Sequence, residues 1–225
     1  MRAVAAVLAG GQSRRMGRDK AFLLVGGRPL IERTLATLDR RFDDVLIVAN
    51  DVVRYAHLGR RVAADLVPGQ GALGGLYTAI ALATGQAAPA RAAAGGGPPV
   101  AATHVFVCAC DMPFLDERLV ALLLERAASG PVDVVVPEDP SAPDSSEGLH
   151  PLCAVYSRRA VPAIERSLRT GRLKVIGFYG TLVVRRVTPE ELRAAGVPPH
   201  ALLNANTPED LARAEALLAA APPLG

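Results

Sequence analysis

The sequence predicts an α/β protein with three layers, α/β/α, built on a mostly parallel, Rossmann-like sheet. Short apolar runs alternate along the chain with helix-like segments of about ten residues or more, which is typical of parallel strands joined by helical crossovers. Half of the 225 residues are hydrophobic, enough to bury a sizeable core. Right-handed crossovers place the loops that follow the strands at one edge of the sheet, where such sheets bind ligands.

Apolar runs define the expected strands, and Ala- or Leu-rich segments between them define the expected helices. The strands are 4–8, 44–49, 61–64, 103–109, 133–137 and 152–156. The helices are 29–38, 74–83, 116–128, 161–169 and 208–220. Pro29 is compatible with the first turn of the first helix. The glycine-rich residues 69–75 are expected to form a loop that leads into the second helix.

One domain covering residues 1–225 is the expectation for a chain of this length. Residues 86–100 are rich in Ala, Gly and Pro and have no usable periodicity, so they are interpreted as a flexible insertion. Residues 137–147 are expected to form a polar loop. Neither segment marks a domain boundary.

Composition excludes several classes of protein. The net charge of +3 is small and its excess lies partly in the first loop, which favours a local anion site over a nucleic-acid surface. The N-terminal apolar run is too short for a secretory signal, and no run is long enough to span a membrane. Three cysteines are a poor disulfide framework and indicate a cytoplasmic protein. Cys108 and Cys110 lack zinc-site spacing and are expected to be buried on the same side of a strand.

The most informative segment is 8–20, LAGGQSRRMGRDK, where a strand runs into a glycine-rich turn. Gly10 and Gly11 allow the backbone to approach a ligand closely with its N–H groups turned inward. The cations of this segment are Arg14, Arg15, Arg18 and Lys20. Neither the Walker A spacing nor the dinucleotide fingerprint is met. An ordinary turn with a solvated basic face has no use for this combination, which indicates a polyphosphate site.

Segment 8–20 resembles the signature of the molybdenum cofactor guanylyltransferases, small nucleotidyltransferases that use GTP. Three further stretches are similar to the same family, in the same order. They are FVCACDMPF at 106–114, HPL with AVY at 150–156, and NANTPEDL at 204–211. The resemblance covers nearly the whole chain. It implies a nucleotidyltransferase sheet and the transfer of GMP from GTP to molybdenum-molybdopterin, with release of pyrophosphate.

The resemblance also implies the GTP site and its Mg²⁺. The residues expected to bind GTP are Leu8, Ala9, Gly10, Gly11, Lys20, Asp65, Gly71 and Asp111. Lys20, Arg15 and Asp111 are the expected catalytic residues. A lysine at a helix start opposes the helix dipole, which suggests that an anion compensates it. Asp111 follows the most hydrophobic strand and is the expected magnesium ligand; one carboxylate is enough, because phosphate and water complete the coordination.

The chain departs from the family pattern at two positions. Ala72 replaces a proline that is often found in the glycine-rich segment near the guanine. Val48 stands where some relatives have an asparagine that contacts nucleotide, although Asn50 can face the same way.

Two residues have competing interpretations. By family position, Asn206 lies on the side of the pterin or of a second metal, but it also precedes a helix start in which Thr207 would be the cap. His150 could contact the acceptor phosphate, although a lone histidine is more often structural. Other proteins of the same biosynthesis are possible partners; nucleic acid and membrane are not expected.

Alternative functions stay open at this point. One is a cytidylyltransferase of the same cofactor, another is a nucleotidyltransferase acting on a sugar phosphate, and a third is a non-catalytic nucleotide-binding adapter. The Leu-Ala-Gly-Gly opening and the Asn-x-Asn-Thr-Pro ending favour guanine. An adapter could have lost Lys20 or Asp111, and this chain retains both.

Overall fold

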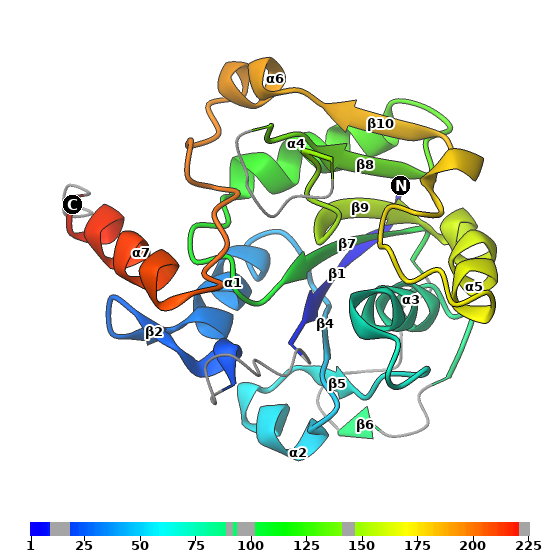
Figure 1. The fold of residues 1–225 in the computed structure, drawn as a ribbon, viewed down its shortest axis with the longest axis horizontal. Coiled ribbons are helices and arrows are strands. Elements are labelled where there is room, and N and C mark those ends of the chain that lie inside the picture. Colours follow the sequence, from blue (N-terminus) through cyan, green and yellow to red (C-terminus); the bar gives the residue numbers. More distant parts are fainter. Residues whose placement is uncertain (10–18, 89–91, 94–101, 141–146, 221–225) are drawn as a thin grey trace.

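The computed structural model describes residues 1–9, 19–88, 92–93, 102–140 and 147–220 (Figure 1). Their middle layer is one sheet with the strand order β10-β8-β9-β7-β1-β4-β5-β6. The bounds are β1 Ala3–Leu8, β4 Val45–Val48, β5 Arg61–Ala63, β6 Ala92–Ala93, β7 His104–Ala109, β8 Val134–Pro137, β9 Cys153–Ser157 and β10 Val184–Val187.

The sheet is mostly parallel, as predicted. Strand β1 pairs in parallel with β4 and β7, β4 with β5, and β8 with β10. Strand β9 is antiparallel to both of its neighbours, and β6 is antiparallel to β5. In β1, Ala5 and Val7 face one core while Val4 and Ala6 face the other. A strand that is buried on both faces needs a continuous apolar run, which is why the sequence revealed it.

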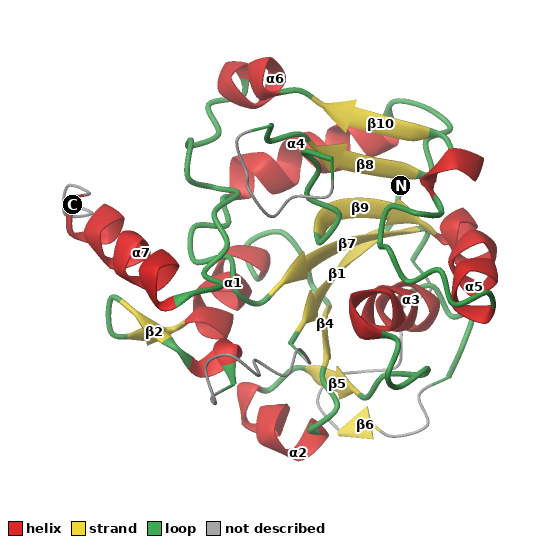
Figure 2. Cartoon of the chain, viewed as in Figure 1, coloured by secondary structure: helices red, strands yellow, loops and turns green. Residues whose placement is uncertain are grey.

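Helices cover both faces of the sheet, which completes the three layers (Figure 2). Helices α1 (Leu30–Leu38) and α4 (Glu117–Ala128) pack on one face, and α3 (Gly71–Ala83) and α5 (Val161–Arg169) on the other. Smaller elements complete the fold. They are the hairpin β2 (Leu24–Val25) and β3 (Arg28–Pro29), α2 (Val52–Tyr55), α6 (Pro189–Ala194), α7 (Pro208–Ala220), and the 3-10 turns η1 (Lys20–Phe22), η2 (Ala56–Leu58), η3 (Arg158–Ala160) and η4 (Tyr179–Thr181).

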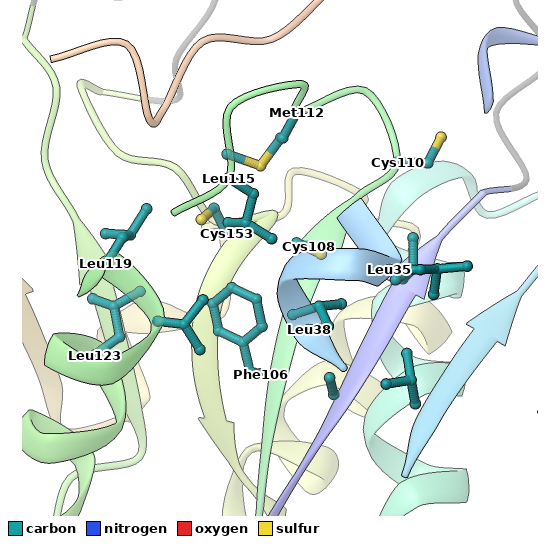
Figure 3. Close-up of a cluster of buried hydrophobic side chains, with 14 of the residues drawn as sticks. Leu35, Leu38, Phe106, Cys108, Cys110, Met112, Leu115, Leu119, Leu123 and Cys153 are labelled. Atoms are coloured by element: carbon teal, nitrogen blue, oxygen red, sulfur yellow. The ribbon is translucent and has the colours of Figure 1, made fainter. Parts of the chain in front are cut away.

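The three cysteines lie in the core between the sheet and α1 and α4 (Figure 3). Cys108, Cys110 and Cys153 are free thiols and are almost fully buried. Cys108 lies opposite Cys153 in the β7–β9 register. The expectation that Cys108 and Cys110 are buried is confirmed, and both belong to the same core, although Cys110 lies one residue past the end of β7.

Two predictions about local structure need correction. Residues 71–75 form the first turn of α3 rather than a loop, because their glycines allow the turn to pack closely: a Cβ at Gly74 would lie 2.9 Å from the carbonyl oxygen of Val67. The proposed insertion at 86–100 is also not wholly without regular structure, since β6 pairs with β5. Residues 89–91 and 94–100 lie outside the described part of the chain. No helix within the described residues is long and apolar enough to cross a membrane.

Candidate active site

Parallel strands β7, β1, β4 and β5 end at the same edge of the sheet, and their backbone pairing continues past the strand ends. Cys110 donates to the carbonyl of Leu8 over 3.1 Å, and Ala9 donates to that of Val48 over 2.9 Å. The residues that follow these strands therefore lie along one edge of the sheet. They include Ala9, Asn50, Asp65 and Asp111.

Lys20, Asp111 and Asn206 meet at this edge. The ammonium group of Lys20 donates to Oδ1 of Asn206 over 2.8 Å and lies 3.8 Å from Oδ2 of Asp111. Asp111 follows β7, and the amide of Ala205 donates to the Asp111 carbonyl over 2.8 Å. Segments 186 residues apart in the sequence thus form one cluster of a cation, a carboxylate and an amide.

The electrostatics of this cluster favour an added cation. The Asp111 side chain is only 14% exposed and that of Lys20 is 22% exposed. Burial raises the pKa of Asp111, while the Lys20 ammonium opposes this and the Asp210 carboxylate adds to it. A carboxylate whose charge is incompletely compensated suits a divalent ion. Within the described residues, no group of three or more His, Cys, Asp or Glu side chains could hold a metal.

The side chain of Asn206 does not cap α7, because its neighbours Thr207 and Asp210 make the capping hydrogen bonds. Thr207 caps α7 by accepting from the amide of Asp210 over 3.1 Å, and the Asp210 carboxylate accepts from the amides of Asn206 and Thr207. The side chain of Asn206 is therefore available to Lys20. Thr207 is thus the cap of α7, as one interpretation predicted. The position of Asn206 on the side of the pterin or of a second metal stays a prediction.

A second pair of polar side chains lies at the ends of β4 and β5. Asn50 donates to Oδ2 of Asp65 over 3.3 Å, and the Asp65 amide donates back to Oδ1 of Asn50 over 3.2 Å. Burial raises the pKa of Asp65, and the Asn50 bond opposes that shift. A Cβ at Gly75 would be 3.6 Å from Leu8 and 3.7 Å from Asp65, so the end of β1, Asp65 and the first turn of α3 adjoin. In the sequence, the spacing of Asn50 from Val48 is the signal that points to Asn50.

The remaining expected residues fall into two groups. Gly10, Gly11 and Arg15 lie outside the described residues. Gly71 is the first residue of α3 and has a φ of +59°, which suits glycine.

His150 is buried; its amide donates to the carbonyl of Pro137, and its Nε2 lies 3.7 Å from Oδ2 of Asp139. Burial lowers the pKa of His150 and Asp139 opposes this. Its contact with the acceptor phosphate stays a prediction.

A mostly parallel sheet that gathers a lysine, a buried carboxylate and amide side chains at the carboxyl ends of its strands defines an α/β protein with a polar ligand site at that edge. The class becomes specific through comparison with known proteins. The chain belongs to the MobA-like NTP transferase domain family, whose model matches residues 5–186.

Two curated relatives carry the same activity in their names, and one solved structure has a related title. "Molybdenum cofactor guanylyltransferase" of Desulfosudis oleivorans is 36% identical over 95% of each chain. "Probable molybdenum cofactor guanylyltransferase" of Pelotomaculum thermopropionicum is 36% identical over 96% of this chain and 94% of its own. The crystal structure of molybdopterin-guanine dinucleotide biosynthesis protein A from Archaeoglobus fulgidus is 26% identical, with a TM-score of 0.75 over 96% of this chain and 98% of its own. The predicted family, fold and nucleotidyltransferase class are confirmed.

Proposed function

We propose that this protein transfers GMP from GTP to the terminal phosphate of molybdenum-molybdopterin, forming the guanine dinucleotide cofactor and pyrophosphate. The observation that carries the proposal is the cluster of Lys20, Asp111 and Asn206 at the carboxyl edge of the sheet. These residues come from three of the four stretches that resemble the family, 8–20, 106–114 and 204–211. Relatives named molybdenum cofactor guanylyltransferase match over more than 90% of the chain.

The acceptor phosphate and the triphosphate are both anionic, so bringing them together requires cations in fixed positions. In the proposed complex, Lys20 turns its ammonium from Asp111 to the triphosphate and is held by the Asn206 amide oxygen. Asp111 would hold Mg²⁺, which neutralises phosphate charge when bound. Arg15 and the amides of Gly10 and Gly11 are proposed to contact the same phosphates.

The nucleoside half is proposed to lie on the side of β4 and β5, against Asp65 and Gly71. Adjacent strands are about 4.8 Å apart, so β7 and β5 are separated by about 14 Å. This span lets Leu8 and Ala9 contact the nucleotide between its base and its phosphates. The acceptor then approaches from the side of Asn206 and His150.

Pyrophosphate release from the purified chain tests the reaction. We expect release with GTP, Mg²⁺ and molybdenum-molybdopterin together, and little with CTP or when the acceptor is omitted. Faster release with CTP would identify a cytidylyltransferase instead. Release that needs a sugar phosphate would identify another nucleotidyltransferase. GTP binding without any turnover, unaffected by Asp111→Asn, would support the adapter.

We also propose that the protein works as a single domain in the cytoplasm, with these small molecules and other proteins of the same biosynthesis as partners. Three unpaired, buried thiols support a reducing compartment. Thermal unfolding of the chain should show a single cooperative transition, as expected of one domain.

A further inference from the structure

Tyr55 links the two residues that flank segment 10–18. Its hydroxyl lies 2.8 Å from the carbonyl oxygen of Ala9, before the segment, and 2.8 Å from Oδ2 of Asp19, after it. The side chain is 1% exposed. A tyrosine has one O–H donor, so both acceptors share it.

Helix α2 holds Tyr55 and Arg54 against Asp19. Its first turn is capped by Asp51, which accepts from the Arg54 amide over 3.2 Å. Arg54 Nε lies 3.4 Å from Oδ2 of Asp19, and its guanidinium lies 5.0 Å from the centre of the Phe22 ring. The Phe22 and Tyr55 rings are 5.2 Å apart. Asp19 is thus held by a hydroxyl and a cation from one short helix.

Asp19 in turn determines the backbone of Lys20. Its Oδ1 accepts from the amide of Ala21 over 3.1 Å and caps η1, the turn that begins at Lys20. The Asp19 carbonyl accepts from the amide of Phe22 over 3.2 Å. The position from which the Lys20 side chain reaches Asn206 therefore depends on where Asp19 is held.

We propose that Tyr55 is a positioning residue for Lys20: its hydroxyl ties Asp19 to the end of β1 and so keeps the Lys20 ammonium at the carboxyl edge of the sheet. The ring alone would fill the core equally well as phenylalanine, so the hydroxyl serves the two chain ends that it joins. The role in catalysis rests on the proposed function, whereas the effect on the position of Lys20 does not.

Hydrogen exchange tests the positioning without any substrate. In Tyr55→Phe we expect the amides of Ala21, Phe22 and Leu23 to exchange about tenfold faster, because a hydrogen bond to a charged acceptor is lost. The control is Tyr77→Phe, which removes a hydroxyl bonded to Glu165 on α5 and should leave these amides unchanged. Unchanged exchange in Tyr55→Phe, or equal acceleration in both variants, would overturn the proposal. If Tyr55→Phe does not fold, Asp19→Asn must accelerate the same amides for the proposal to stand.

Kinetics test the coupling to Lys20. We expect Tyr55→Phe to lower kcat for GMP transfer about 10- to 100-fold while changing the KM for the acceptor less than twofold. In a Lys20→Ala background, Tyr55→Phe should lower kcat less than twofold, because the ammonium group that Tyr55 positions is absent. A full, multiplicative loss in that background would show a general structural role and refute the proposal. If the wild type turns over no GTP, the proposed function fails, and exchange alone decides the positioning role.

Discussion

Replacing Asp111 by asparagine should abolish activity and yet stabilise the protein at neutral pH. Asparagine has nearly the same shape but carries no charge. Burial raises the pKa of Asp111 above its ordinary value of 3.8 even though Lys20 lies nearby. Ionising this carboxyl therefore costs folding free energy, and the variant avoids that cost.

The distances indicate the size of the effect. The 3.8 Å between the charged groups of Lys20 and Asp111 corresponds to an attraction of about 4 kcal/mol at an effective dielectric constant of about 20. Since the pKa is raised nevertheless, the cost of burial exceeds this attraction. Removing such an unfavourable buried charge at a functional site typically adds about 1 kcal/mol to the free energy of unfolding. This raises Tm by about 2–4 °C for a chain of this size.

The stability difference between Asp111→Asn and the wild type should depend on pH with a definite sign. Below pH 3.8 the carboxyl is protonated in both the folded and the unfolded chain, and the variant gains nothing. Between that pH and the raised pKa of the folded state, the folded wild type binds more protons than the unfolded chain, so its stability falls as pH rises. The advantage of Asp111→Asn should therefore grow as the pH rises from 3.8 toward the raised pKa of the folded state.

Thermal unfolding in EDTA at a series of pH values from 4 to 8 measures this difference. Added Mg²⁺ should then stabilise the wild type more than the variant, because binding to the folded state raises its Tm. An Asp111→Asn protein that is less stable than the wild type by the same amount at every pH would refute the argument. So would a variant that keeps normal GMP transfer.

Five further substitutions test other contacts in the structure. Lys20→Ala should lower GMP transfer at least 10²–10³-fold, measured by pyrophosphate release, because a fixed charge-stabilising donor is lost. Asn206→Ala should lower kcat about 10-fold, because Lys20 loses its hydrogen-bond acceptor. Thr207→Ala should leave kcat unchanged. It should reduce the free energy of unfolding by about 1 kcal/mol, because the cap of α7 is lost. Gly74→Ala should destabilise the fold by about 1–3 kcal/mol in denaturant unfolding, since its Cβ would lie 2.9 Å from a backbone oxygen, while Gly75→Ala, with contacts of 3.6 Å or more, should cost less.

Each of these has a contradicting result. Near-normal turnover without Lys20 would remove it from the mechanism. Equal kcat losses in Asn206→Ala and Thr207→Ala would assign both residues to α7 alone. Equal stability of the two alanine variants at Gly74 and Gly75 would mean that the first turn of α3 adjusts its packing.

The sequence revealed elements whose side-chain pattern follows from burial on both faces. The run at 103–109 is an example, observed as β7 from His104 to Ala109. Strand β10 (Val184–Val187) escaped prediction because it lies at the sheet edge and contains two arginines, so no apolar run marks it. Helix α6 also escaped; its capping box of Thr188 and Glu191 was its main local signal.

The chemistry of the site was visible in the chain as isolated residues. Glycines and cations after β1, an acid after β7 and an Asn-Thr-Pro segment before α7 are all local patterns, set by the spacing of neighbouring residues. Their meeting is not local. The Lys20–Asn206 hydrogen bond joins positions 186 residues apart, and the pairing of β1 with β7, a strand distant in the sequence, brings Asp111 beside them. Strand order and the return path of the last helix depend on packing summed over the whole core, which no short stretch of sequence encodes.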